Sequence, residues 1–167
     1  MMRTFIASLA LLTLSACGLQ PLYSGGSSDA VAQGLAAVDV APIQGRDGWL
    51  VRNALNDRLQ LTGERASPLY RLDVQLDDSL EALGVLNDDT ISRERRILRA
   101  RYQLVDLASG AILLDATSGS DAGIDVVSSE YATIAAEQTA LENLAREVAD
   151  RMVRQVALTL REAESAQ

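Results

Sequence analysis

Few residues in this chain are suited to covalent chemistry. The sequence holds a single cysteine, Cys17, no histidine and no lysine, so all 15 of its basic side chains are arginines. Zinc sites built on histidine or cysteine, and Ser-His or Cys-His nucleophiles, need residue types that are missing here. These zinc sites and nucleophiles are therefore excluded, and we expect no metal ion and no cofactor.

Four arginines stand at odd-numbered positions, and on a β-strand they would share one face. They are Arg93, Arg95, Arg99 and Arg101. Planar guanidinium groups are well suited to binding phosphates. The alternative interpretation is cross-strand pairing with Asp73 and Asp77. Arg96 has the opposite parity, whereas the apolar Ile97 and Val105 share the arginine face and would suit a surface buried in a partner.

Two groups of neighbouring acidic residues are weaker candidates. Asp77 and Asp78 are adjacent, so on a strand they point to opposite faces, and we reject them as a catalytic pair. The run Asn87-Asp88-Asp89 lacks the alternating spacing of a calcium loop, and a solvated turn is the better interpretation.

The overall charge limits the partners that we expect. The formal net charge is −8, and it becomes −9 if residues 1–16, which carry Arg3, are removed. Non-specific nucleic-acid binding relies on a basic surface. We therefore expect no nucleic-acid partner.

The N-terminus is typical of an export signal that ends at a lipidation site. Arg3 supplies a positive charge, and residues 5–14 form an apolar run that is too short for a membrane-spanning helix. Leu14-Ser15-Ala16-Cys17 resembles the lipobox of bacterial lipoproteins, in which the cysteine carries diacylglycerol. A plain secreted protein is the alternative, but a lone cysteine in an exported protein needs an explanation. We expect cleavage after residue 16, a lipid on Cys17 as the only membrane contact and, from Gly18, sorting to the outer membrane.

Residues 17–34 contain a glycine pair, serines and a proline, which is typical of a flexible tether. A single domain is predicted over residues 35–167. It begins with a strand at 35–43, where Val38 and Val40 alternate with a polar residue. Asp47 is suited to cap a helix over 48–62, and Gly63 to end it.

Three strands are predicted next, over 69–77, over 90–106 and from Ile112 onward, with a loop near Gly84 and a tight turn at Ser109-Gly110. Alternation predicts their core-facing residues: Tyr70, Leu72, Val74 and Leu76; Leu98, Ala100, Tyr102 and Leu104; Ile112, Leu114 and Ala116.

A last helix of roughly 34 residues is predicted from Ser128 or Ser129, with Glu130 near its positive end. Its apolar stripe consists of Tyr131, Ile134, Leu141, Leu144, Ala145, Val148, Met152, Val156 and Leu160. Its polar face is too acidic for attraction to anionic lipid, so the stripe should pack on the sheet. Because such a helix is about 50 Å long and a nine-residue strand about 30 Å, we expect its C-terminal end to project beyond the sheet.

The order strand-helix-strand-strand-strand-helix predicts the α+β class. Each strand has one apolar face and each helix one apolar stripe, which fits two helices packed on one face of a four-stranded, mostly antiparallel sheet. The other face of the sheet would be polar and open.

Two segments carry a resemblance to a known family. They are Cys17-Gly18-Leu19-Gln20-Pro21-Leu22-Tyr23 and the last helix, with Tyr131, Ala135-Ala136-Glu137, Ala140 and Ala149-Asp150-Arg151. They are similar to segments of the LPS-assembly lipoprotein LptE family. The resemblance implies a non-catalytic protein at the outer membrane, inside an LptD-like β-barrel that delivers lipopolysaccharide to the outer leaflet. It would plug the barrel, aid its assembly and bind lipopolysaccharide, and the four odd-numbered arginines would contact lipopolysaccharide or the barrel.

Two other functions fit the sequence less well. A periplasmic auxiliary lipoprotein of an ABC-type lipid transporter would share the lipobox and the α/β build, but the Tyr-Tyr-Leu-like start typical of those proteins is missing. A minor surface hydrolase is disfavoured because the chain has neither histidine nor a G-x-S-x-G motif.

Overall fold

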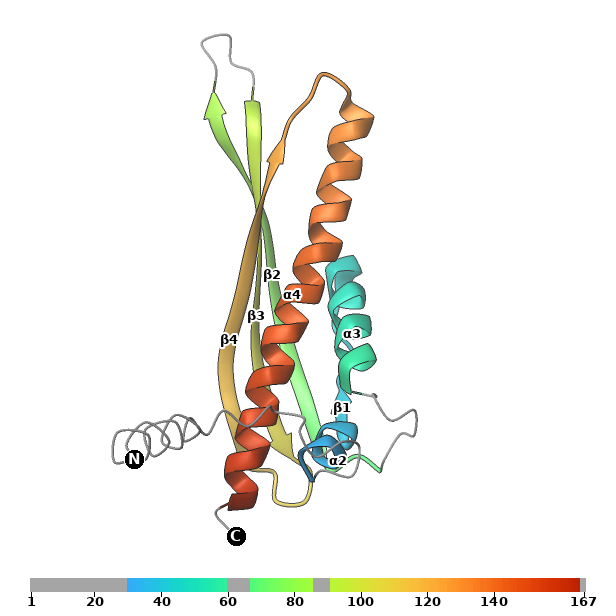
Figure 1. Cartoon of the computed structure of the whole chain (residues 1–167), viewed down its shortest axis with the longest axis vertical. Helices are drawn as coiled ribbons and strands as arrows, with labels where there is room; N and C mark the ends of the chain where they lie inside the picture. Colours follow the sequence, from blue (N-terminus) through green and yellow to red (C-terminus); the bar gives the residue numbers. More distant parts are fainter. Residues whose placement is uncertain (1–29, 60–66, 86–90, 166–167) are drawn as a thin grey trace, which may run out of the picture.

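The computed structural model describes residues 30–59, 67–85 and 91–165, which form a long sheet backed by helices (Figure 1). The elements are α2 (Ala30–Ala36), β1 (Val38–Val40), α3 (Gly45–Leu59), β2 (Tyr70–Val85), β3 (Ile91–Asp106), β4 (Ile112–Asp125) and α4 (Glu130–Ser165). The strand order is β1-β2-β3-β4, with β1 parallel to β2 and the other neighbours antiparallel. The predicted α+β class and element order are confirmed, with the short helix α2 added.

The core lies between the inner face of the sheet and helices α3 and α4. The predicted inward positions of β3 are all buried, and so is the predicted α4 stripe from Leu141 to Leu160. Tyr102 is the largest of these fully buried side chains, and its hydroxyl lies 3.3 Å from Ser118 Oγ. The period of two in the strand and the helical spacing in α4 are therefore both confirmed.

Three predicted core residues are exposed instead. Tyr131 and Ile134, in the first turns of α4, are 83% and 44% exposed because this end of the helix extends past the buried cluster. Ile112 is 57% exposed because the register shifts between Leu104 and Val105, so that Ile112 lies opposite Val105 on the outer face. A bulge of this kind reverses the facing of every residue beyond it.

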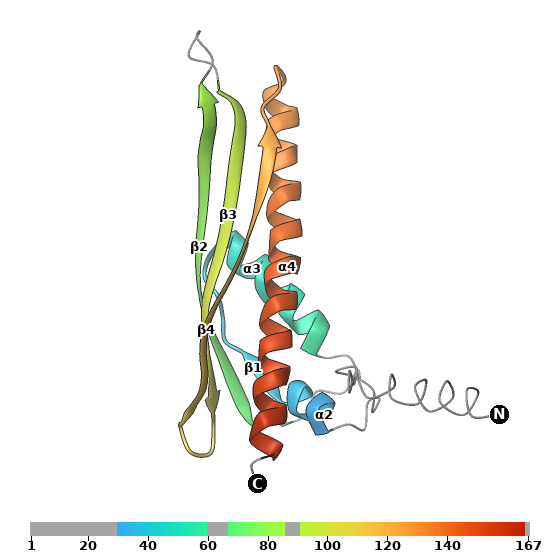
Figure 2. The same cartoon turned by 60° about the vertical axis from the view of Figure 1, so that its left-hand side comes forward.

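The C-terminal end of α4 does not project beyond the sheet, contrary to prediction. Strands β2 and β3 each have 16 residues, or about 53 Å, and the 36 residues of α4 span about 54 Å. β2 continues past the predicted end at residue 77 because β3 pairs with it as far as Val85. The end of α4 lies beside the β3–β4 turn in both views (Figures 1 and 2).

The N-terminal boundaries also differ from the prediction. Residues 30–34, assigned to the tether, belong to α2, and β1 is confined to Val38–Val40. Val31 and Leu35 are one turn apart and both buried, and a Cβ at Gly34 would lie 3.3 Å from Leu160 of α4. Because of this packing, residues 30–34 are a helical part of the domain and not of the tether.

The predicted helix over 48–62 corresponds to α3, which begins three residues earlier, at Gly45. Gly45 has a positive φ of 84°, and Asp47 lies in the first turn rather than at the cap. The predicted stop at Gly63 and the run Asn87-Asp88-Asp89 lie outside the described residues.

Candidate functional site

The four odd-numbered arginines of β3 lie on the outer face of the sheet, opposite to the face that carries α4. Arg93, Arg95, Arg99 and Arg101, called the arginine stripe below, are all exposed, while Leu98, Ala100 and Tyr102 between them are buried. Ile97 and Val105 lie on the same face and are partly exposed. Strand parity thus predicted the face correctly.

The carboxylates that pair with the stripe come from β4. Arg93 pairs with Asp125 at 3.3 Å, Arg95 with Asp121 at 3.0 Å and Arg101 with Asp115 at 3.0 Å. The Arg101 contact, with a further hydrogen bond from Gln103, lowers the pKa of Asp115. The expected partners on β2 were wrong, since Asp73 instead accepts hydrogen bonds from Arg71. Exposed pairs of this kind contribute little stability, so an anionic ligand can compete for these guanidinium groups.

Arg99 differs from the rest of the stripe. Among the described residues no carboxylate forms an ion pair with it, although Asp77 is its register partner on β2. On its other side lies Gly119 of β4, where a Cβ would stand only 3.2 Å from Arg99 Cγ. The glycine therefore makes room for the stem of this arginine. Both residues line an open hollow of about 290 Å³ that also includes Ile97 and Arg151.

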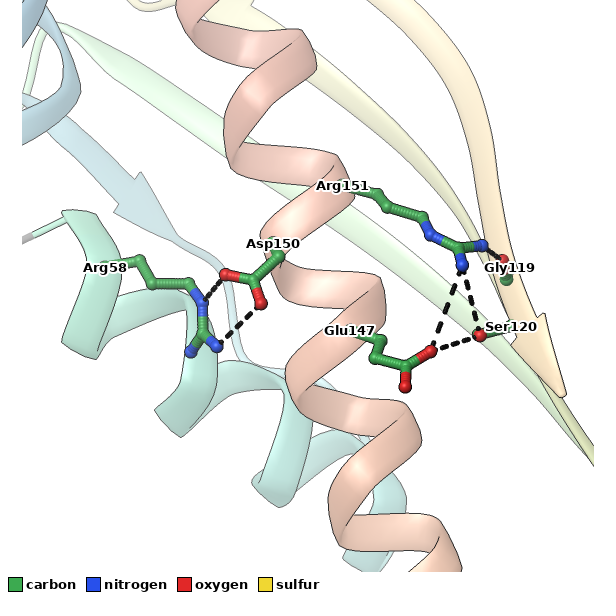
Figure 3. Close-up of polar contacts among 6 residues, drawn as sticks. All are labelled: Arg58, Gly119, Ser120, Glu147, Asp150 and Arg151. Atoms are coloured by element: carbon green, nitrogen blue, oxygen red, sulfur yellow. Dashed lines mark hydrogen bonds and ion pairs between the residues drawn. The ribbon is translucent and has the colours of Figure 1, made fainter. Parts of the chain in front are cut away.

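Two consecutive residues of α4 hold the helix in place from opposite sides (Figure 3). Asp150 accepts two hydrogen bonds from Arg58 of α3, one of them 3.1 Å long. Arg151 donates to the carbonyl of Gly119 and, at 3.3 Å, to Ser120 Oγ on β4. Ser120 Oγ in turn donates to Glu147 Oε2 at 2.6 Å. Asp150 and Arg151, part of the segment that carries the family resemblance, thus join α4 to α3 and to the sheet edge.

Replacing Asp150 with asparagine is expected to lower the free energy of unfolding by about 1 kcal/mol at neutral pH, as for a partly exposed ion pair. The hydrogen bonds from Arg58 hold the pKa of Asp150 below its ordinary value. A carboxyl with a lowered folded-state pKa stabilises the fold above its unfolded pKa of about 3.9, and this stabilisation is lost as the pH falls through the folded value.

Urea unfolding of both proteins between pH 7 and pH 2 measures this difference. We expect it to be full at neutral pH and to shrink below about pH 4. Glu142→Gln, which changes an exposed α4 carboxylate with no ion pair in the described structure, is the control and should change little. A difference between wild type and D150N that stays constant down to pH 2 would contradict the role of the Asp150 carboxylate.

An ion pair that the sequence did not predict lies on the inner face of the sheet. Arg96 of β3 donates to both carboxylate oxygens of Asp78 on β2, at 2.9 and 2.5 Å, and to the carbonyl of Glu137 on α4 at 3.2 Å. Asp77 is exposed on the opposite face. The two neighbouring aspartates therefore face apart, as predicted, and they do not form a dyad.

The described residues contain no group of three or more acidic, histidine or cysteine side chains placed to hold a metal ion. Within the same residues, no helix combines the length and the hydropathy needed to cross a membrane. The outer face thus carries four exposed arginines in a row, three of them paired with aspartates of β4, and Arg99 is the one without an ion pair among the described residues.

The fold defines a class of small α+β domains that recurs among solved bacterial lipoproteins. A candidate lipoprotein from Caulobacter crescentus is 26% identical, with a TM-score of 0.67 over 81% of this chain and 98% of that one. The rare lipoprotein B from Shewanella oneidensis (12% identity, TM-score 0.59, covering 75% and 99%) and a minor lipoprotein from Acinetobacter baumannii (14%, 0.54, 72% and 88%) share the fold. No curated protein sequence matches this chain.

The assignment to a family rests on the sequence rather than on the fold. The model of the LptE family, described as lipopolysaccharide-assembly, matches residues 35–156, which is most of the domain. The chain therefore belongs to the LptE family, and the family predicted from the two ends of the mature sequence is confirmed.

Proposed function

We propose that this protein is an outer-membrane lipoprotein, anchored through Cys17, that assembles with an LptD-like β-barrel and plugs it during insertion of lipopolysaccharide into the outer leaflet. Membership of the LptE family supports this proposal. The observation that carries it furthest is the arginine stripe, an exposed row of cations on a protein whose formal net charge is −8. The role is one of binding and assembly. The family match disfavours the alternative of an adaptor for an ABC-type lipid transporter.

The stripe is suited to the phosphates of lipopolysaccharide. Guanidinium groups bind phosphate oxygens in a planar, two-point geometry, and charged hydrogen bonds are the stronger ones. Arg99 can bind a phosphate without breaking an ion pair. Arg101 must first break its ion pair with Asp115. Arg99 should therefore contribute most to binding.

Replacing Arg99 with glutamine is expected to weaken lipopolysaccharide binding about tenfold, which corresponds to a loss of roughly 1.4 kcal/mol. Arg101→Gln is the matched control on the same strand and face. It should weaken binding less, because the wild-type Arg101 gives up its pairing with Asp115 on binding. Titration of each purified protein with lipopolysaccharide at constant ionic strength measures the effect, with thermal unfolding as the check on the fold.

Changing all four stripe residues to glutamine should remove most of the binding. Unchanged binding by the fourfold variant, with its fold intact, would eliminate the phosphate contact. Equal losses for R99Q and R101Q would show that Arg99 has no special role.

A further inference from the structure

Large apolar side chains are exposed at one end of the domain, around the β3–β4 turn. They are Leu69, Leu107, Ile112 and Leu113, which are 58%, 46%, 57% and 36% exposed. Backbone hydrogen bonds join two of these residues to the start of the domain. Leu107 N–H donates to the carbonyl of Leu69, and Leu69 N–H donates to the carbonyl of Ala37, both at 2.9 Å. Ala37 directly follows α2.

The run that follows Asp106 in the turn contains no charged residue. Residues 107–114 read Leu-Ala-Ser-Gly-Ala-Ile-Leu-Leu, in a chain of which 23% is charged. Other apolar residues are exposed at the opposite end, among them Leu83 and Tyr131, but there Glu81, Arg93 and Glu130 are exposed among them. Charged groups oppose transfer into hydrocarbon. The uncharged run 107–114 is therefore better suited to lipid than the opposite end, although Arg161 and Glu162 are exposed at the end of α4 beside it.

The backbone N–H groups of the turn are hydrogen-bonded within the protein, which lowers the cost of removing them from water. Asp106 Oδ1 accepts the N–H groups of Ala108 at 3.0 Å and Ser109 at 2.7 Å, and the Asp106 carbonyl accepts Gly110 N–H at 2.8 Å. The N–H of Ala111 donates to Ser109 Oγ at 3.2 Å. With Leu107 N bonded to Leu69, the N–H groups of residues 107–111 are all satisfied within the protein. Burial of an unsatisfied amide is what normally keeps a loop out of hydrocarbon.

The same end of the domain is the one closest along the chain to the proposed lipid. Ala30 lies thirteen positions after Cys17, and a chain of that length spans at most about 45 Å. Helix α2, which begins at Ala30, packs against Leu160 near the C-terminal end of α4. Figures 1 and 2 both place α2 and the β3–β4 turn at this end, with the hairpin end of β2 and β3 at the other.

We propose that the β3–β4 turn, residues 107–113 together with Leu69, enters the membrane leaflet that holds the acyl chains of Cys17. This inference rests on the lipid anchor of the proposed function. Asp106 and Asp115 flank the apolar run and limit its entry to the region just below the lipid headgroups. A lipid on Cys17 holds the protein at the membrane without fixing its direction. The turn would be a second membrane contact, beside the lipid that was expected to be the only one, and it would fix the direction of the long axis of the domain relative to the membrane.

Fluorescence of the full lipidated protein on vesicles tests the proposal. An Ala108→Cys variant, whose lipidated Cys17 has no free thiol, is labelled with nitrobenzoxadiazole and bound to phosphatidylethanolamine–phosphatidylglycerol vesicles without any partner protein. Ala82→Cys, an exposed alanine near the opposite end of the domain, is the matched control. We expect the emission at residue 108 to shift to the blue and to be quenched by quenchers carried on acyl chains. The dye at residue 82 should show neither effect.

Replacing Leu107, Ile112 and Leu113 with serine should abolish the shift at residue 108 while leaving thermal unfolding nearly unchanged, since the three side chains are exposed. A dye at residue 108 that stays in water, on protein whose lipid on Cys17 is verified by mass spectrometry, overturns this inference alone. Absence of lipid on Cys17 overturns the proposed anchor and this inference together. A shift that requires an added barrel protein assigns the turn to a protein contact and also overturns it.

Discussion

Replacement of Arg96 with alanine is expected to lower the free energy of unfolding by about 2 kcal/mol, between the values for exposed and for fully buried ion pairs. Its side chain and that of Asp78 are only 17% and 18% exposed. Without Arg96 the Asp78 carboxylate would lose the donors to both of its oxygens in a site with limited access to water, and the carbonyl of Glu137 would lose a donor. Urea unfolding followed by circular dichroism measures the loss.

Two further variants test whether the unpaired Asp78 carboxylate, rather than the loss of any arginine, causes the loss of stability. Arg93→Ala breaks an ion pair whose side chains are 61% and 77% exposed, and it should lower stability by less than about 1 kcal/mol. Changing Arg96 to methionine and Asp78 to leucine together removes both charges and should recover most of the stability lost in R96A. Equal losses for R96A and R93A, or no recovery in the double variant, would contradict the account.

The sequence predicted the faces of the strands well because side-chain direction depends only on parity. Arg96 was separated from the arginine stripe on this basis, and the structure places it on the inner face with Asp78. Parity cannot predict which strand supplies a partner, since that depends on register. The stripe therefore finds its carboxylates on β4, although Asp73 and Asp77 of β2 had been expected.

The register shift near Leu104 explains why the facing of Ile112 was wrong. The shift arises from the pairing of β3 with β4, and no local pattern in residues 107–114 predicts it. Signals for two other features were present in the sequence. Gly119 stands at an outward position of β4, where the stem of Arg99 needs space. Val31 and Leu35 have helical spacing that predicts α2.

The contacts of Asp150 and Arg151 were only partly predictable. Adjacent helical residues point about 100° apart, so two charged neighbours of this kind must face different surroundings. That one meets Arg58 on α3 and the other the edge of β4 follows from how α4 lies between these elements, which the sequence does not contain. The same limit applies to Tyr131 and Ile134, whose helical spacing matches the buried stripe although no core surrounds them.

Assembly with a β-barrel is tested most directly by affinity purification of the full lipidated protein from detergent-solubilised outer membranes. A lipoprotein of unrelated fold, tagged and expressed in the same way, serves as the control. We expect a large β-barrel protein to be recovered with this chain in near-equal amount, and not with the control. Recovery of the chain without any β-barrel protein, under conditions that keep membrane complexes intact, would contradict the proposed function.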